Sequence, residues 1–348
     1  MAPKEPQAAK GSNMDRIEGP RERSFLERLI ESSKSVLKSA GSLLVELRHA
    51  RGAARIDIWG RIGLFIPALA GVFIITLILS LLMYESAPIL LSPEGGPGIL
   101  VNPIWAPNQG QFGILVFIAG TFMCSGLAIV IAIPLGVGGA IFLSEFCPHR
   151  VRTSLRMVIE LMAAIPSIVY GLWAFTSLRF WVAGVGESFL GISLNGLSLL
   201  SGSLILAVML VPTVVAVSDD ALQSVPVTYR EASLALGATT SETARKVVLS
   251  AALPGVGAAV VLSLGRAVGE TMAVLMVTGN SLQIPLTLFD PCYVMTSIIT
   301  NQLGTAYVEP LWRSALFSVA LVLMLMSTMF TIAAKLFIRW GMKTRGIK

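Results

Sequence analysis

The sequence contains few charged residues. Asp, Glu, Lys and Arg make up only 13% of its 348 residues, whereas soluble domains usually carry about 25%. Hydrophobic residues make up 54%, and the mean hydropathy is +0.77. This composition argues against a water-soluble globular protein. The few charges are gathered in separate stretches, which indicates a membrane protein.

Residues that would mark an enzyme or a metal centre are also scarce. The sequence has three cysteines and two histidines, with no CxxC pair and no Cys/His cluster. We therefore predict no disulfide framework, no metal site and no catalytic residue in this chain. A Gly-x-x-x-x-Gly-Lys-[Ser/Thr] phosphate loop is absent too, so we expect no ATP site of that type and no cofactor in this chain.

Long apolar runs are what the sequence does have. A hydrocarbon core of about 30 Å requires helices of about 20 residues, and the alternating pattern of a β-barrel, the other fold that satisfies its backbone in lipid, is missing. We predict an all-α membrane protein with six spans. The expected spans are 62–82, 112–143, 157–178, 197–217, 254–279 and 314–338. Pro134 is expected to tilt, kink or break the second span.

Basic residues are distributed unevenly between the loops. Of the 26 Lys and Arg residues, 23 lie before the first span, in the segment from Lys335 onward, or in the 144–156 and 218–253 loops. The other loops hold only Arg179 and Arg313. Because basic loops stay in the cytoplasm, both termini are predicted to be cytoplasmic (N-in/C-in).

Two parts are expected along the chain: a cytoplasmic N-terminal arm over 1–55 and a transmembrane domain over 56–348. The arm should begin as a flexible stretch, and leucines at helical spacing between Ser24 and Leu47 then predict an amphipathic helix. That helix could lie on the inner leaflet, on a partner, or on the bundle itself. The first apolar run begins near Ile62, which is too deep for a cleavable signal peptide.

The loop over 218–253 differs from the others because it is long, amphipathic and flanked by two spans. Pro226 and a possible N-cap at Thr228 predict a short helix. Gly237 is expected to end that helix. A second helix is expected from Ser241, with Glu242 in its first turn, and it would return the chain to the membrane. Such a helical pair could pass motion from a soluble partner into the spans.

This loop resembles the cytoplasmic signature of bacterial ABC-importer permeases: Glu-Ala-Ala, three residues, Gly, nine residues, Ile-x-Leu-Pro. Glu231, Ala232 and Gly237 match its spacing, whereas Ser233 replaces the second Ala and Ser250 replaces the Pro. The resemblance implies a type I importer permease fold with a cytoplasmic coupling helix that docks on an ATPase subunit. The residues expected to couple to the ATPase are Tyr229, Arg230, Glu231, Ala232, Gly237 and Ala238.

The fifth span contains two opposite charges, Arg266 and Glu270, spaced four residues apart. A charge at the bilayer centre costs about 2.5–3.5 kcal/mol or more, so both are expected to face the bundle interior or a watery path. On one helix face they could pair, either to fix helix register or to handle a passing anion. Gly265 and Gly269 should let another helix approach closely.

The run from Gly265 to Asn280 is similar to that of the permease subunits of phosphate-specific ABC importers (PstC-type). The third span adds a similar run, from Glu160 through Pro166 and Tyr170 to Gly171. The resemblance covers about 55–345. We expect five residues to line the substrate path: Arg266, Glu270, Thr271, Pro166 and Tyr170. Pro166 should kink its helix, and Arg156 is expected to pair with Glu160 as an anchor rather than a gate.

The resemblance implies a non-catalytic transport subunit of an ATP-hydrolysing complex, placed in the bacterial cytoplasmic (inner) membrane. Its implied partners are two ATPase subunits that use ATP, a second homologous permease (PstA-type), an extracytoplasmic phosphate-binding protein, phosphate and membrane lipid, with no nucleic acid. Three alternatives remain: a permease for sulfate, molybdate or phosphonate, an ion-coupled secondary anion transporter or channel, and a membrane scaffold without transport.

Overall fold

The computed structural model describes residues 53–93, 95–191 and 194–344. The amphipathic helix expected between Ser24 and Leu47 lies outside these residues. The chain divides into two compact units, 1–77 and 78–348. The boundary falls inside helix α2 (Ala53–Leu91), so the described part of the first unit is helical throughout.

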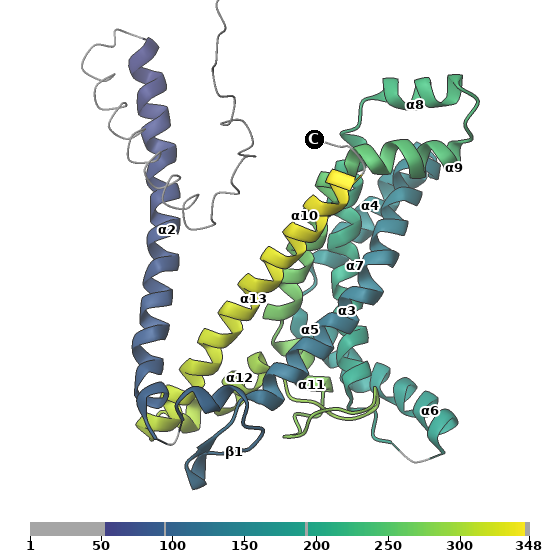
Figure 1. Cartoon of the computed structure of the whole chain (residues 1–348). Helices are drawn as coiled ribbons and strands as arrows, with labels where there is room; N and C mark the ends of the chain where they lie inside the picture. The colour runs from purple at the N-terminus through teal and green to yellow at the C-terminus, as the bar shows by residue number, and fades with distance from the viewer. Residues whose placement is uncertain (1–52, 94, 192–193, 345–348) are drawn as a thin grey trace, which may run out of the picture. The chain divides into compact units, whose positions relative to one another are not determined.

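The second unit is built almost entirely of helices (Figure 1). Its main helices are α3 (Leu115–Ile141), α4 (His149–Ala164), α5 (Ser167–Trp173), α6 (Arg179–Leu190), α7 (Leu199–Gln223), α8 (Val227–Ala235), α9 (Thr240–Glu242), α10 (Leu249–Gly269), α11 (Met272–Val277), α12 (Met295–Ala306) and α13 (Pro310–Thr344). Turns of π-helix extend α3 (η3, Phe142–Phe146), join α5 to α6 (η4, Ala174–Leu178) and join α9 to α10 (η5, Thr243–Val248).

A short hairpin lies between the first two spans. Strand β1 (Trp105–Ala106) pairs antiparallel with β2 (Gln111–Phe112), and the 3₁₀ turns η1 (Pro97–Leu100) and η2 (Pro107–Gln109) adjoin it. Gly110 closes the hairpin with a positive φ of 70°, which glycine adopts at little cost. The buried Trp105 ring packs edge-on against Phe117 of α3, so the hairpin is fixed to the bundle.

Six helices of the described chain are long and apolar enough to cross a membrane, which confirms the predicted number. They cover Gly63–Leu91, Leu115–Phe146, Ser167–Ser188, Leu199–Gln223, Thr240–Gly269 and Pro310–Trp340. Pro134 does not break the second of them, because α3 continues through it.

Two of the predicted spans have the wrong boundaries. The third was expected over 157–178, but the chain breaks at Pro166, and the apolar helix begins after the break. Residues 149–164 form the separate, charge-bearing helix α4. The fifth was expected over 254–279, but its helix starts at Thr240 and ends at Gly269. Proline disfavours helical geometry at the preceding residue, and Ile165 before Pro166 is extended (φ −63°, ψ 130°), which accounts for the first break.

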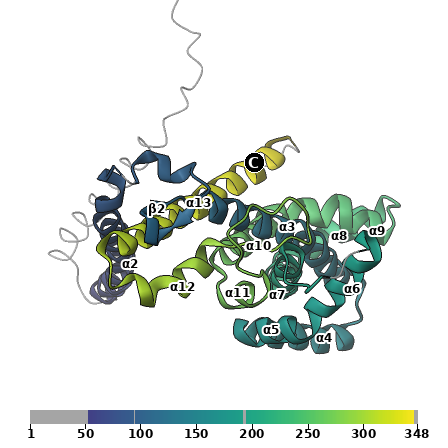
Figure 2. The same cartoon turned by 90° about the horizontal axis from the view of Figure 1, so that it is seen from below.

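The core of the second unit forms around α3 and α7, which pack along their length. Their approach is close: a Cβ on Gly136 would lie 2.6 Å from the Val214 side chain. Helix α10 packs against α7 and α13, and α11 contacts both α5 and α12 (Figure 2). The third-span and fifth-span runs therefore meet inside the bundle.

Candidate functional site

The fifth span is interrupted where its two charges lie. Helix α10 ends at Gly269, Glu270 is extended (φ −69°, ψ 132°), and α11 begins at Met272. The expectation that Arg266 and Glu270 share one helix face and pair is therefore wrong. The described residues contain no ion pair between them, because the helix ends before Glu270.

Arg266 is half-buried and contacts the neighbouring span. Its Nη1 donates a hydrogen bond to Thr213 Oγ1 of α7 at 3.1 Å. A guanidinium has five N–H donors, and Arg266 makes no other side-chain hydrogen bond to the described residues. The arginine therefore has one fixed contact and donors left over for a ligand.

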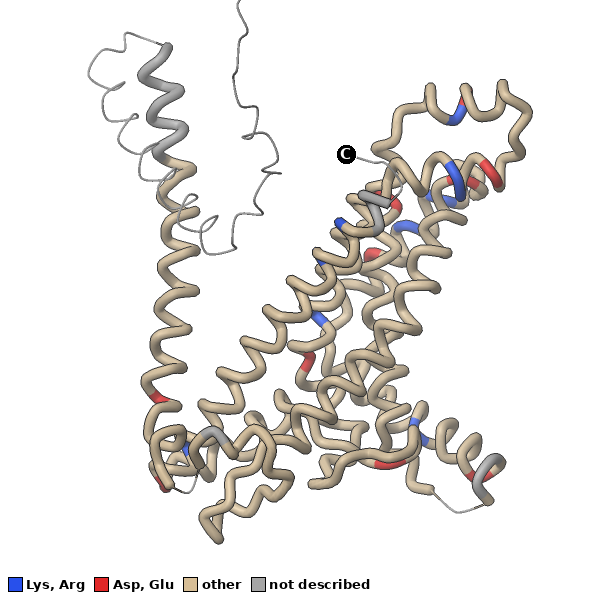
Figure 3. Tube along the Cα trace, in the orientation of Figure 1, with Lys and Arg blue, Asp and Glu red and all other residues tan. Residues whose placement is uncertain are grey.

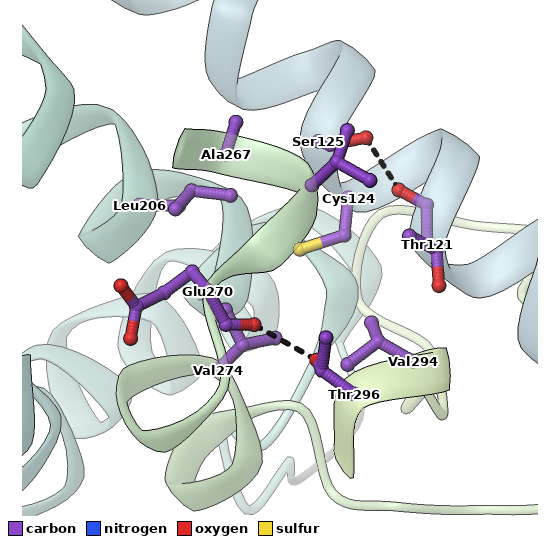
Figure 4. Close-up of a pocket in the computed structure, with 10 residues that line it drawn as sticks. Thr121, Cys124, Ser125, Leu206, Ala267, Glu270, Val274, Val294 and Thr296 are labelled. Carbon is purple, nitrogen blue, oxygen red and sulfur yellow. Dashed lines mark hydrogen bonds between the residues drawn. The ribbon is translucent and has the colours of Figure 1, made fainter. Parts of the chain in front are cut away.

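Glu270 stabilises the break instead of pairing with Arg266. Its Oε1 accepts hydrogen bonds from the backbone N–H groups of Thr271 (3.2 Å) and Ala273 (3.5 Å), at the start of α11. A carboxylate at a helix N-terminus is favoured by the helix dipole. The backbone carbonyl of Glu270 accepts a hydrogen bond from Thr296 Oγ1 at 2.8 Å, which ties the break to α12 (Figure 4).

A small cavity of about 10 Å³, with a mixed polar and apolar lining, adjoins this break. Its lining includes Thr121, Ser125, Glu270 and Thr296, and the carboxylate of Glu270 points away from Thr121 and Thr296 (Figure 4). Thr121 Oγ1 accepts a hydrogen bond from the backbone of Met295 at 2.9 Å. The cavity has room for about one water molecule, so it is too small for a tetrahedral oxyanion.

The third-span run reaches the same region. Tyr170 is buried, and its hydroxyl donates to the Met162 carbonyl at 2.8 Å, across the break at Pro166. The next residue, Gly171, lies against α11: a Cβ there would come within 2.9 Å of Ala273 Cα. The structure therefore packs the residue after Tyr170 against α11, which follows the break at Glu270, while Pro166 itself is exposed.

Close packing was expected at Gly265 and Gly269, and it does not occur there. A Cβ on either glycine would meet no heavy atom of the chain within 4 Å. The close approaches occur instead at Gly171 and at Gly257, where a Cβ would lie 2.6 Å from Ile338 of α13. Among the described residues, no neighbouring helix therefore packs closely against Gly265 or Gly269.

The 218–253 loop folds into the predicted helical pair. Helix α8 begins at Val227 after Pro226, one residue before the expected Thr228 cap. Gly237 ends it with a φ of 83°, and the backbone bonds from Gly237 N to Leu234 O and from Ala238 N to Ser233 O form a Schellman motif.

The return helix begins one residue earlier than expected, at Thr240. Its N-cap is Thr239, which forms a reciprocal capping box with Glu242. Ser233, one of the departures from the family signature, is buried, and its hydroxyl lies 2.9 Å from that of Thr243. This hydrogen bond joins the two helices of the loop.

The expected coupling residues divide into two groups. Tyr229, Glu231 and Ala232 are exposed on α8. Arg230 instead points inward: it binds Glu145 of η3 through Nη2 (2.8 Å) and Nε (3.1 Å). It also donates to the carbonyls of Leu222 and Val225. The geometry makes Arg230 an anchor for α8 rather than part of its outer surface.

A second charge cluster joins α4 to α7. The predicted Arg156–Glu160 pair is confirmed, with Nε and Oε1 2.8 Å apart. Arg156 also binds Asp219 and Asp220 of α7, and Arg152 binds the same buried Asp219 at 2.9 Å. The carboxylates of Glu160 and Asp220 accept hydrogen bonds from Arg156 and raise the pKa of its guanidinium above the ordinary value. Sequence reasoning missed these aspartates, although Asp219-Asp220 interrupts the end of an apolar run.

Charged residues gather at the end of the bundle where α8 and α9 lie (Figure 3). Among the described residues, no group of three or more His, Cys, Asp or Glu side chains could hold a metal ion. Thr213, Thr296 and Gly171 are further contacts that the sequence did not predict. Each is a common residue type within an apolar stretch of sequence, and its role becomes visible only from the residue that it contacts in the folded chain.

Comparison with known proteins agrees with this geometry. Residues 132–340 match the family described as binding-protein-dependent transport system inner membrane component. The chain is 40% identical to the probable ABC transporter permease protein YqgH of Bacillus subtilis over 254 residues, which cover 70% of this chain and 81% of that protein. It is 35% identical to the phosphate transport system permease protein PstC of Haemophilus influenzae, over 72% of this chain and 84% of that protein.

The fold is also that of solved importers. A chain of a bacterial ABC transporter involved in the import of the polysaccharide alginate superposes with a TM-score of 0.56 at 15% identity, over 83% of this chain and 99% of that chain. The chain therefore belongs to the family of binding-protein-dependent transport system inner membrane components, among the PstC-type permease proteins of ABC importers.

Proposed function

We propose that this chain is the permease subunit of an ATP-driven phosphate importer in the bacterial cytoplasmic membrane and forms half of the translocation path. The observation that carries the proposal is Arg266, a half-buried arginine in a span, which keeps donors free beside a helix break. Its relatives named as phosphate permeases support phosphate as the anion.

The residues around the break would handle the anion as follows. The planar guanidinium of Arg266 fits a tetrahedral oxyanion through two N–H donors. Glu270 holds the start of α11 and places a negative charge nearby, which weakens the hold on phosphate and favours its release. Thr271 adds a hydroxyl next to the break, and Tyr170 belongs to α5, which packs against α11.

Coupling to ATP would occur at the other end of α10. In the proposed N-in/C-in orientation, α8 presents Tyr229, Glu231 and Ala232 to one of two ATPase subunits in the cytoplasm. A PstA-type permease would complete the path, and an extracytoplasmic binding protein would deliver phosphate. ATP-driven closure of the ATPases would push α8 and open the bundle outward, and hydrolysis would return it to the inward state. This chain itself would catalyse no reaction.

The direct test is radiolabelled phosphate uptake by the complete complex in proteoliposomes, with competition by arsenate, sulfate, molybdate and phosphonate. The proposal predicts ATP-dependent phosphate uptake that only arsenate inhibits. Uptake of a different oxyanion would keep the permease assignment and change the substrate. Uptake driven by an ion gradient without ATP would favour a secondary transporter instead.

Matched variants test the role of Arg266. Arg266→Gln should lower uptake by about tenfold or more, because a cation in a low-dielectric cleft raises local anion concentration by about 10–10³-fold, while Arg266→Lys should keep a fraction. Thr213→Val should weaken uptake and Thr213→Ser should not, since only the serine keeps the hydroxyl that Arg266 binds. Full uptake by an Arg266→Gln/Glu270→Gln double variant would show that both charges are structural.

A further inference from the structure

A second, larger groove lies between three helices of the bundle. Its volume is about 620 Å³. The lining residues come from α7, α10 and α13, and they are Val217, Pro254, Gly257, Ala258, Val261, Leu262, Lys335, Ile338 and Arg339. The groove has apolar walls, with two cations on its α13 side.

The groove continues the face that carries Arg266. Leu262 and Ala258 precede Arg266 on α10 by four and eight residues, and Val217 follows Thr213 on α7 by four. Residues four apart lie on the same side of a helix, about 6 Å apart along its axis. The groove therefore begins about one helical turn from the Arg266–Thr213 hydrogen bond, in the direction of the coupling loop.

The two cations on α13 lack partners within the described chain. Lys335 and Arg339 are exposed and four residues apart, so they lie on one face of the helix. Neither forms a hydrogen bond or an ion pair with any described residue. Three other described cations near this end behave differently: Arg152, Arg156 and Arg230 bind carboxylates. Like charges at this spacing destabilise a helix by a few tenths of a kcal/mol.

We infer that this groove is the route by which the anion leaves Arg266, with Lys335 and Arg339 as a second, weaker anion-attracting station at its mouth. The inference rests on the proposed function. Apolar walls give the anion no place to bind, whereas the two free cations attract it along the groove. The anion thus passes from the guanidinium of Arg266, which can donate two hydrogen bonds to it, to the exposed charges of Lys335 and Arg339. There it is hydrated and released into water.

The test uses the complete complex in proteoliposomes made of neutral lipid, with MgATP and a phosphate sensor in the compartment that the coupling loop faces. Lys335→Gln/Arg339→Gln should lower the maximal rate of phosphate release by about tenfold and leave the external phosphate concentration for half-maximal uptake unchanged. Lys335→Glu/Arg339→Glu should lower the rate further, and Lys335→Arg/Arg339→Lys should preserve it. Arg150→Gln, which removes an exposed cation outside the groove, is the control.

High ionic strength provides an independent readout, since salt screens exposed charges over about 8–10 Å. Raising the salt should reduce the difference between the wild-type and Gln-substituted complexes. Equal rates for the Gln variants and Arg150→Gln, in a complex that does move phosphate, would overturn the inference. A defect confined to vesicles with anionic lipid would also overturn it and assign the cations to lipid headgroups. A wild-type complex that moves no phosphate would instead refute the proposed function.

Discussion

The ion pair between Arg230 and Glu145 offers a sharp test of how the coupling helix is held. Arg230 lies within the signature loop, where the sequence suggests contact with an ATPase. The structure turns it toward Glu145, 85 residues away, and toward two carbonyls at the end of α7. We predict that Arg230→Gln impairs transport because α8 loses its anchor.

The magnitude follows from burial. Glu145 is 7% exposed and Arg230 is 22% exposed. Removing one partner of a buried pair costs about 3–5 kcal/mol, and the partial exposure of Arg230 favours the lower figure, about 3 kcal/mol. At 1.4 kcal/mol per tenfold, the equilibrium between docked and undocked α8 should shift by about a hundredfold. Glu145→Gln should cost less, about 1–2 kcal/mol, because it leaves no buried carboxylate unpaired.

The assay is a double-mutant cycle on the assembled complex. Hydrogen exchange of the α8 amides reports the anchor, and phosphate uptake reports its consequence. Arg230→Gln should speed exchange in α8 and lower uptake, and adding Glu145→Gln should recover part of both. Arg245→Gln, an exposed cation of the same loop, is the control. An Arg230→Gln defect that is unchanged by Glu145→Gln, with normal exchange in α8, would refute the anchor and favour direct contact with the ATPase.

Three further predictions concern backbone geometry and pH. Gly237→Val should abolish ATP-coupled uptake while the chain still inserts, because φ +83° costs a branched residue about 1–2 kcal/mol; Gly237→Asn should retain uptake. Gly171→Ala should lower uptake by forcing α5 from α11, at about 1–3 kcal/mol of overpacking, whereas Gly184→Ala, with nothing within 4 Å, should not. Hydrogen bonds from the backbone of Thr287 and Leu286 lower the pKa of Asp290. These hydrogen bonds therefore stabilise the loop fully above the ordinary Asp pKa of about 3.9, and the stabilisation is lost as the pH falls through the lowered pKa of Asp290. Hydrogen exchange of the Thr287 amide should speed up over that pH range. In the Asp290→Asn variant this pH dependence should disappear.

The spans and the coupling loop could be predicted because their signals are local. Hydrocarbon thickness sets the length of an apolar run, and this predicted the correct number of spans. Gly237 marked a helix end because few other residues adopt positive φ cheaply. The errors arose at Pro166 and Glu270, where an apolar run continues through a break. Hydropathy does not respond to such breaks, and the backbone groups they free are satisfied by residues far away in the sequence.

The contacts of the candidate site could not be predicted for the same reason. The four-residue spacing of Arg266 and Glu270 predicts a pair only if the helix continues, and it ends first. Arg266 binds Thr213, 53 residues away, and the Glu270 carbonyl binds Thr296, 26 residues away. Threonine is common in spans, so nothing in the sequence distinguishes these two. The charge pattern predicted that Arg266 and Glu270 would pair with each other, and in the structure each has other partners.

One helical element joins the coupling loop to the helix break beside Arg266. From the capping box at Thr239 the helix runs without interruption from Thr240 to Gly269, a length of 30 residues. At 1.5 Å per residue this is about 45 Å. Ser233 and Thr243 fix α8 to one end of this element, and Arg266 and the break at Glu270 lie at the other. A displacement of α8 therefore reaches the break as motion of a packed helix. Since Glu270 is held to both α11 and α12 by hydrogen bonds, we predict that such a motion would move Arg266 relative to the Glu270 carboxylate. A change in the distance between them is the physical step that would convert a tight anion site into a weak one.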